Sequence, residues 1–172
     1  MSTLIIRIAG KNDAELIADI SRQVFYETFA TQNTQENVDI FMTKQFSKQK
    51  LMEEVGSAGN IFLLAYDGGK VAGYVRLKET EQEKDMDKME SIEIARLYAM
   101  TTKIGTGVGS FLMQQCIDTA KKMNKNKIWL GVWEKNYRAI RFYKKWGFEI
   151  FSEQDFVLGN DIQRDWLMQK FL

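Results

Sequence analysis

The stretch that decides the fold is KIGTGVGSFLM, Lys103 to Met113. It places Gly105, Gly107 and Gly109 at every second position and continues directly into a helical pattern. Glycine is useful where a Cβ would block a close approach or where φ must be positive. Free backbone N–H groups at the positive end of a helix dipole form a site for an anion such as a phosphate. We therefore expect an anion cradle here, the alternative being a tight turn whose glycines serve only the backbone conformation.

The spacing of hydrophobic residues predicts different elements before and after this loop. SIEIARLYAM (91–100) predicts a strand before it, and the residues after it predict a helix over 110–124 and a strand over 127–133. Such a strand, helix and strand form a right-handed crossover with parallel or splayed strands. The other expected elements are a strand at 4–9, a helix that a capping box of Asn12 and Glu15 opens and that runs to about 28, a helix from 34, a short helix capped by Ser47, a hairpin at 60–79, a helix at 136–146 and strands near 148–158 and 165–172. We expect one mixed α/β domain over 1–172, with a mostly antiparallel sheet, a splayed parallel pair and flanking helices.

The composition limits the kinds of partner and cofactor. The 172 residues, 45% of them hydrophobic, fit one domain with a sizeable core. With 24 basic and 23 acidic residues, the net charge is too small to attract the protein to nucleic acid or a membrane surface. Neither is expected as a partner. No membrane-spanning run or signal-peptide pattern is present, so the cytoplasm is the expected location. The absence of histidine and the single Cys116, which falls on an apolar helical stripe, argue against a metal site and place this thiol in the core.

Two common phosphate motifs do not fit the glycine loop. A dinucleotide site requires GxGxxG with an acidic residue about 20 positions later. Here the spacing is GxGxG, and Lys125, Asn126 and Lys127 occupy the later positions. The GxxxxGK motif of nucleotide triphosphate sites is absent. The pyrophosphate of coenzyme A remains.

The loop resembles the pyrophosphate motif of the GNAT superfamily of acetyl-CoA-dependent N-acetyltransferases. That motif, Gln or Arg, two residues, Gly, one residue, Gly or Ala, maps on 104–109, with Gly107 and Gly109 in the glycine places. Ile104 departs from it, which puts a side-chain contact in doubt but leaves the backbone cradle. The resemblance implies acetyl-CoA as co-substrate, held by the loop and by the backbone of the preceding strand. The residues concerned are Leu97, Tyr98, Ala99, Gly105, Thr106, Gly107, Val108, Gly109 and Ser110.

A second motif, NYRAIRFYKKWGF (136–148), resembles the downstream motif of the same family. The resemblance implies that Asn136 contacts the cofactor arm and that Tyr143 lies near the thioester sulfur. A neutral phenol is still protonated at neutral pH, so Tyr143 suits the protonation of a departing thiolate. The alternative makes Ile140, Phe142 and Tyr143 packing residues of an amphipathic helix.

Acetyl transfer to a primary amine needs a base, because an amine of pKa about 10.4 is mostly protonated at neutral pH. In a regular strand, Glu93 and Ala95 point to one face while Ile92, Ile94 and Arg96 point to the other. An acid between two isoleucines on a central strand is unusual. We therefore expect Glu93 to take the proton, through a water, the alternative being an exposed or arginine-paired carboxylate without a chemical role.

Three further stretches, 27–37, 129–136 and 144–148, resemble the PaiA-type spermidine/spermine N-acetyltransferases. This implies a small-molecule amine acceptor, foremost a polyamine. Acidic residues that could receive its charges are Glu27, Glu36, Asp39, Glu79, Glu81, Glu83, Asp85, Asp87 and Glu90, although lysines alternate with the later ones as in a solvated loop.

Two other functions are open at this point. One is acetylation of a protein N-terminus or lysine, and the other is a CoA-binding regulator without turnover. A homodimer is also possible, since the last strand can pair within the chain or across two copies.

Overall fold

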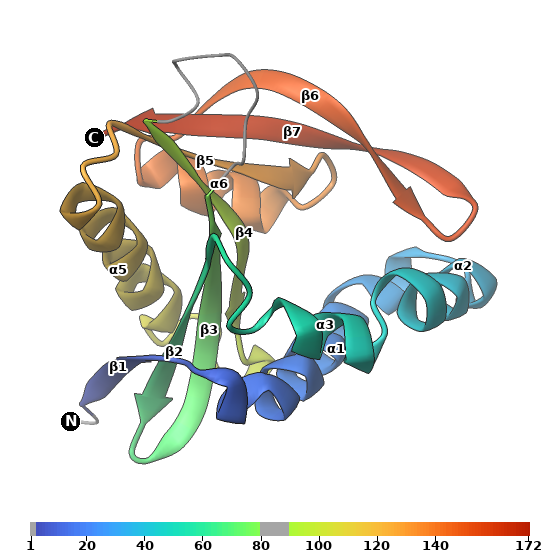
Figure 1. Cartoon of the computed structure of the whole chain (residues 1–172). Helices are drawn as coiled ribbons and strands as arrows, with labels where there is room; N and C mark the ends of the chain where they lie inside the picture. The colour runs from blue at the N-terminus through green and yellow to red at the C-terminus, as the bar shows by residue number, and fades with distance from the viewer. Residues whose placement is uncertain (1–2, 80–89) are drawn as a thin grey trace.

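The computed structural model describes residues 3–79 and 90–172. Its centre is a seven-stranded sheet in the order β1-β2-β3-β4-β5-β7-β6 (Figure 1). The strands are β1 (Leu4–Ile8), β2 (Asn60–Asp67), β3 (Lys70–Lys78), β4 (Ser91–Ala99), β5 (Lys127–Trp133), β6 (Glu149–Leu158) and β7 (Asp161–Phe171). All neighbours are antiparallel except β4 and β5. The predicted mixed α/β fold with one parallel pair is confirmed.

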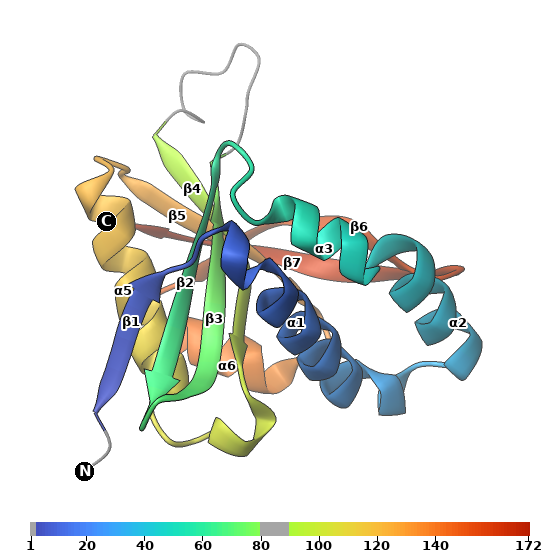
Figure 2. The same ribbon diagram turned by 60° about the horizontal axis from the view of Figure 1, so that its bottom comes forward.

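Helices cover both faces of this sheet (Figure 2). One group comprises α1 (Ala14–Phe29), α2 (Gln35–Ile40), the π-helical segment η3 (Phe41–Gln45) and α3 (Lys48–Glu54). The other comprises α5 (Val108–Lys122) and α6 (Tyr137–Lys145). Short 3-10 turns lie at η1 (Lys11–Asp13), η2 (Ala30–Gln32) and η4 (Thr101–Lys103).

Two helix starts differ from the sequence-based expectation. The predicted capping box of Asn12 and Glu15 is wrong, because Asp13 is the N-cap of α1 and a 3-10 turn, in which the Gly10 N–H donates to Asp13 Oδ2 at 2.9 Å, comes first. Helix α5 begins at Val108 and not at Ser110, because Gly107 is its N-cap with a φ of 93°. The last two residues of the predicted loop therefore already belong to the helix.

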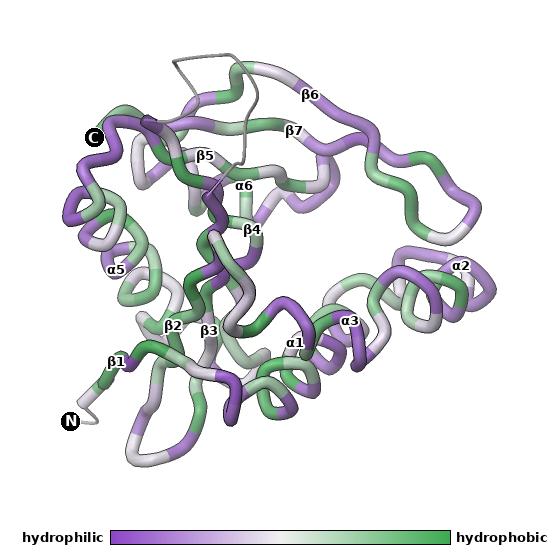
Figure 3. Tube along the Cα trace, in the orientation of Figure 1, coloured by the Kyte–Doolittle hydropathy of each residue, from purple (hydrophilic) through white to green (hydrophobic). Residues whose placement is uncertain are grey.

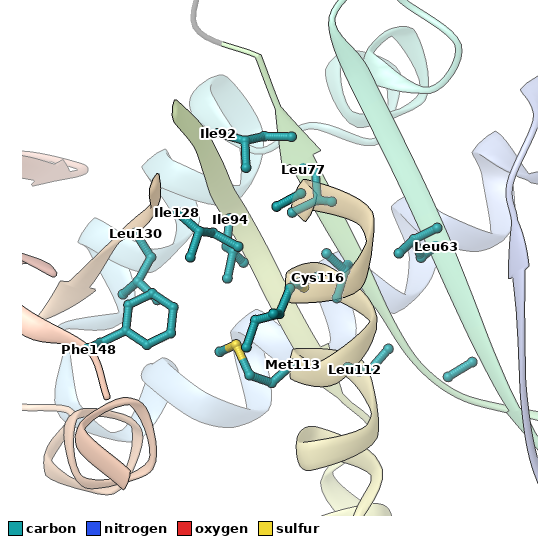
Figure 4. Close-up of a cluster of buried hydrophobic side chains, with 14 of the residues drawn as sticks. Leu63, Leu77, Ile92, Ile94, Leu112, Met113, Cys116, Ile128, Leu130 and Phe148 are labelled. Atoms are coloured by element: carbon teal, nitrogen blue, oxygen red, sulfur yellow. The ribbon is translucent and has the colours of Figure 1, made fainter. Parts of the chain in front are cut away.

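The face under α5 holds the larger apolar core. Leu112, Met113 and Cys116 of α5 are fully buried and belong to one apolar cluster with side chains of β3 and β4, among them Leu77 and Ile94 (Figure 4). The predicted core position of Cys116 is confirmed, since its side chain is 0% exposed. Apolar residues run along β2, β3 and the inner face of α5 (Figure 3), so this core fixes the crossover that carries the glycine loop.

On the opposite face, α1 packs against β2 and β3, and a cluster rich in phenylalanine joins α1, η3 and the end of β6. The hairpin is fastened to α2 by the Asn160 N–H, which donates to Asn37 Oδ1 at 2.8 Å. Gly159 lies so close that a Cβ there would be 2.6 Å from the Asn37 backbone, so the turn requires glycine. The hairpin therefore reaches over the sheet edge to the α1–α2 side (Figure 1).

Candidate active site

A cleft opens where the two parallel strands separate. β4 and β5 pair only at 91–93 with 127–129. Beyond these positions β4 keeps its pairing with β3, and β5 keeps its pairing with β7. The resulting cleft has a volume of about 800 Å³. Leu97, Tyr98 and Ala99 line it, and their backbone groups on the open side have no partner strand within the described chain. An extended cofactor arm can hydrogen-bond there as a further strand would.

A β-bulge shapes β4 just before the cleft. Arg76 of β3 pairs with Arg96, whereas Leu77 pairs with Ile94, so Ala95 is an extra residue. An inserted residue reverses the alternation of side chains beyond it. The prediction that Arg96 shares a face with Ile94 is therefore wrong. Ile94 packs under α5, and Arg96 points to the α1–α3 face.

Arg96 is held on that face by Glu54 of α3. Its guanidinium donates to both Glu54 oxygens at 2.6 and 2.9 Å and lies 5.1 Å from the centroid of the Phe46 ring. Arg76 also pairs with Glu54, at 2.8 Å. This network anchors α3 to the bulged strand at one wall of the cleft.

The glycine end of the cleft is the surface formed by Gly105, Gly107 and Gly109 with Asn136 and Tyr143. The φ angles of Gly105 and Gly107 are 81° and 93°, and a Cβ at either position would meet no atom within 4 Å. The space in front of the loop is open, and the first N–H groups of α5 have no intrahelical acceptor. This geometry fits the predicted anion cradle.

Of the other loop residues predicted to bind the cofactor, one lines the cleft and two do not. Ser110, in the first turn of α5, lines the cleft. Val108 is instead buried in the core under the sheet, and exposed Thr106 does not line the cleft, since its hydroxyl donates to the Lys103 carbonyl at 2.7 Å. Any contribution of these two residues to an anion site would come from the backbone.

Asn136 caps α6 at the same end of the cleft. Its Oδ1 accepts the Ala139 N–H at 3.2 Å, which leaves the two Nδ2 donors for other partners. Asn136 itself lines the cleft. The cap thereby fixes the direction in which its amide donors can act.

Tyr143 lies about two turns further along α6 and also lines the cleft. Its ring centroid is 5.5 Å from that of Phe142 and 5.9 Å from that of Phe148. Burial raises the pKa of the Tyr143 phenol, with a further contribution from Cys116. The phenol is therefore protonated across the neutral range, as a proton donor must be.

Glu93 does not line the cleft. It is partly buried on β4, and burial raises the pKa of its carboxyl against the opposing effects of Lys78, Arg76 and Arg96. Both arginines form their ion pairs with Glu54, not with Glu93, among the described residues. Glu93 can reach the cleft only through an intermediary such as water.

The other end of the cleft, here named the aromatic end, was not predicted. It is formed by Phe25, Phe29, Phe41, Phe46, Trp133 and Phe156, together with Gln163 and Asp165 of β7. The rings contact one another across elements that are distant in sequence. Phe29 meets Trp133 edge-on at 5.9 Å, and Phe41 lies 5.7 Å from Phe156. The cleft thus joins the glycine end, which is rich in backbone groups, to a largely apolar chamber.

Comparison with known proteins identifies this arrangement. The model of the acetyltransferase (GNAT) family matches residues 19–148. The chain belongs to the GNAT acetyltransferase family. An uncharacterized N-acetyltransferase of Lactobacillus delbrueckii subsp. lactis is 34% identical over 168 residues, covering 98% of this chain and 96% of that protein. Membership confirms the prediction of an acetyl-CoA-dependent N-acetyltransferase.

Two Thermoplasma acidophilum proteins give further comparisons. A spermidine N(1)-acetyltransferase is 26% identical over 159 residues, covering 89% of this chain and 94% of the relative. The crystal structure of the PaiA N-acetyltransferase in complex with coenzyme A superposes with a TM-score of 0.80 at 22% identity and covers 99% of both chains. At that identity the superposition shows the shared fold.

The acids nominated for a polyamine lie outside the cleft of this GNAT protein or outside the described residues. Glu27 accepts a hydrogen bond from the Thr101 hydroxyl at 2.6 Å, and Asp39 accepts one from Gln35. Glu36, Glu79 and Glu90 do not line the cleft either. Glu81, Glu83, Asp85 and Asp87 lie outside the described residues.

Other absences concern the described parts of the chain. There, no helix is long and apolar enough to cross a membrane. The same residues contain no group of three or more His, Cys, Asp or Glu that could hold a metal ion.

Proposed function

We propose that this GNAT protein transfers the acetyl group of acetyl-CoA to a primary amine of a small molecule, with a polyamine as the foremost acceptor. The observation that carries the proposal is the continuity of the cleft. The open N-terminus of α5, the unpaired edge of β4 and the Tyr143 phenol line the glycine end, and the apolar chamber adjoins them. A donor with a pyrophosphate and an extended arm fits the first part, and an acceptor with an alkyl chain fits the second.

The residues of the glycine end would hold acetyl-CoA through their backbone. The loop N–H groups face the pyrophosphate, and β4 at 97–99 hydrogen-bonds the pantetheine arm. Asn136 contributes its Nδ2 donors to the same arm. Acetyl-CoA supplies the thioester, whose carbonyl carbon the amine attacks.

Two side chains manage the protons of the proposed transfer. A new N–C bond forms as the C–S bond breaks, and Tyr143 gives its proton to the departing thiolate. Glu93 accepts the proton that the amine loses, through water, because its own carboxyl lies outside the cleft. A free carboxylate is required for this step, and the raised pKa of Glu93 makes it a stronger base than an exposed glutamate.

A polyamine is supported by the named activity of the Thermoplasma relative and by the motif resemblance. The proposal is tested by measuring thiol release from acetyl-CoA with spermidine, spermine, a diamine and a short lysine peptide. Preference for the polyamines is the expected result. Preference for the peptide would indicate a protein acetyltransferase, and CoA binding without transfer to any acceptor would indicate a non-catalytic regulator.

A further inference from the structure

A single carboxylate lies in the aromatic end of the cleft. Among the described residues that line the cleft, Asp165 is the only one with a carboxyl group. In the β5–β7 pairing, Asp165 is directly opposite Trp133. Opposed residues of neighbouring strands point to the same face of a sheet. Asp165 and the Trp133 indole therefore belong to one wall of the cleft.

The absence of a side chain at Gly131 leaves room for this carboxylate. A Cβ at Gly131 would lie 3.4 Å from Asp165 Oδ2 and 3.3 Å from Gln154 Nε2. Gly131 itself lines the cleft. The Asp165 carboxylate is thus turned toward the bare backbone of β5 and not away from the sheet.

The charge of Asp165 is not matched by the protein. Within residues 3–79 and 90–172 its carboxylate forms no hydrogen bond or ion pair. Burial alone raises its pKa to about 6. Of the basic residues that line the cleft, Arg96 and Lys103 are each paired with an acid outside it, and Arg138 belongs to α6 at the glycine end. A partly buried carboxylate without a partner among these residues favours a cationic ligand.

The surrounding rings suit an alkyl ammonium ion. Phe29 and Trp133 meet edge to face next to Asp165, and Phe41 and Phe156 continue the wall. Aromatic faces attract cations and bury methylene groups. A chain of methylenes ending in an ammonium group therefore matches both the shape and the charge of the aromatic end.

We propose that Asp165 binds a second ammonium group of the acceptor, which makes the acceptor a diamine or polyamine whose alkyl chain lies along the aromatic end. This inference rests on the proposed function and names the residue behind its specificity. The attacking nitrogen must be neutral, and a nearby carboxylate stabilises the charged form of an amine. Asp165 therefore suits the amino group that stays protonated during the reaction.

The test compares α,ω-diamines of butane, hexane and octane with the monoamines of the same length. We expect the protein to prefer a diamine in kcat/KM by roughly 10- to 100-fold, the usual range for a hydrogen bond to a charged group. Asp165→Asn should remove this preference while leaving the monoamines within about threefold of their original rates. Asp155→Asn, the same change at an exposed position of β6, is the matched control and should keep the preference.

Asp165→Glu gives a second variant that retains the charge. It should still prefer diamines but favour a shorter one, because its carboxylate extends further into the cleft. If Asp165→Asn lowers kcat/KM equally for monoamines and diamines, or lowers it for neither, the inference is overturned.

A protein that transfers acetyl to no amine would contradict the proposed function, not the cation site. Calorimetric titration of hexane diamine into the CoA-loaded protein then decides the matter. Weaker binding of hexane diamine by Asp165→Asn, but not by Asp155→Asn, supports the site. Equal binding by both variants and the unchanged protein overturns it.

Discussion

The two ends of the cleft are built on different physical principles. The glycine end is made of backbone: a helix N-terminus, an unpaired strand edge and two glycines with positive φ. The aromatic end is made of side chains that α1, η3, β5, β6 and β7 bring together. The backbone site depends on a short continuous segment, whereas the aromatic chamber depends on packing between distant ones. Substitutions at the first should affect the donor, and substitutions at the second should affect the acceptor.

The largest effect is expected for Tyr143→Phe, in the glycine end. Loss of the phenolic proton should lower kcat by about 100-fold, the lower part of the range for general acid catalysis, with little change in the KM of acetyl-CoA. Steady-state kinetics checks this. Tyr137→Phe, on the same helix and 65% exposed, is the control. A collapse in acetyl-CoA affinity would instead assign Tyr143 to packing.

Replacing a glycine of the loop, and comparing it with the same change in a distant turn, should distinguish a loss of acetyl-CoA binding from backbone strain. Gly107→Ala should raise the KM of acetyl-CoA by roughly 10- to 50-fold, because a methyl group obstructs the approach of phosphate to the helix N-terminus. Gly69→Ala is the control, since Gly69 also has a positive φ, 79°, and open space around it, but lies in the β2–β3 turn.

Both glycine variants should lose about 1 kcal/mol of stability, because a Cβ disfavours the left-handed conformation. The free energy of unfolding in urea measures this loss. An equal change in acetyl-CoA KM for both variants would contradict a cradle at Gly107.

Glu93→Gln should have a smaller effect, because the proposed base acts through water. We expect kcat/KM for the amine to fall about tenfold near neutral pH and less near pH 10, where the free amine is already abundant. The rate profile over pH checks this, with exposed Glu149→Gln as control. A profile identical to that of the unchanged protein would exclude Glu93 as the base.

The last expected effect is on stability and not on turnover, and it comes from the aromatic end. Since the folded-state pKa of Asp165 is raised to about 6, above about 3.9 in the unfolded chain, the folded state binds more protons between these values. Stability should therefore fall as the pH rises from about 4 to about 6. Asp165→Asn should remove this fall and be more stable by about 1 to 2 kcal/mol at pH 7, after allowance for partial exposure. Urea unfolding at both ends of this window measures it, and a parallel pH dependence in the two proteins would contradict the burial of this charge.

Much of the fold could be predicted from sequence, because hydrophobic residues recur with a different spacing in strands and in helices. The hairpin of β2 and β3 and the parallel pair joined by the crossover through α5 follow from such signals. The face of Arg96 could not be predicted, since a single extra residue at Ala95 reverses the alternation and leaves no trace in the hydrophobic pattern.

The sequence by itself determined the glycine end: the positive-φ glycines, the Asn136 cap and the position of Tyr143 depend on short segments whose backbone chemistry is local. Only the tertiary structure decided the aromatic end. Phe29, Trp133 and Asp165 come from three separate elements, and none of them has a local feature that distinguishes it from a packing or surface residue. They become one chamber because β4 and β5 separate and the β6–β7 hairpin reaches across to α2. Such long-range contacts are set by packing of the whole core and are not encoded in any one stretch.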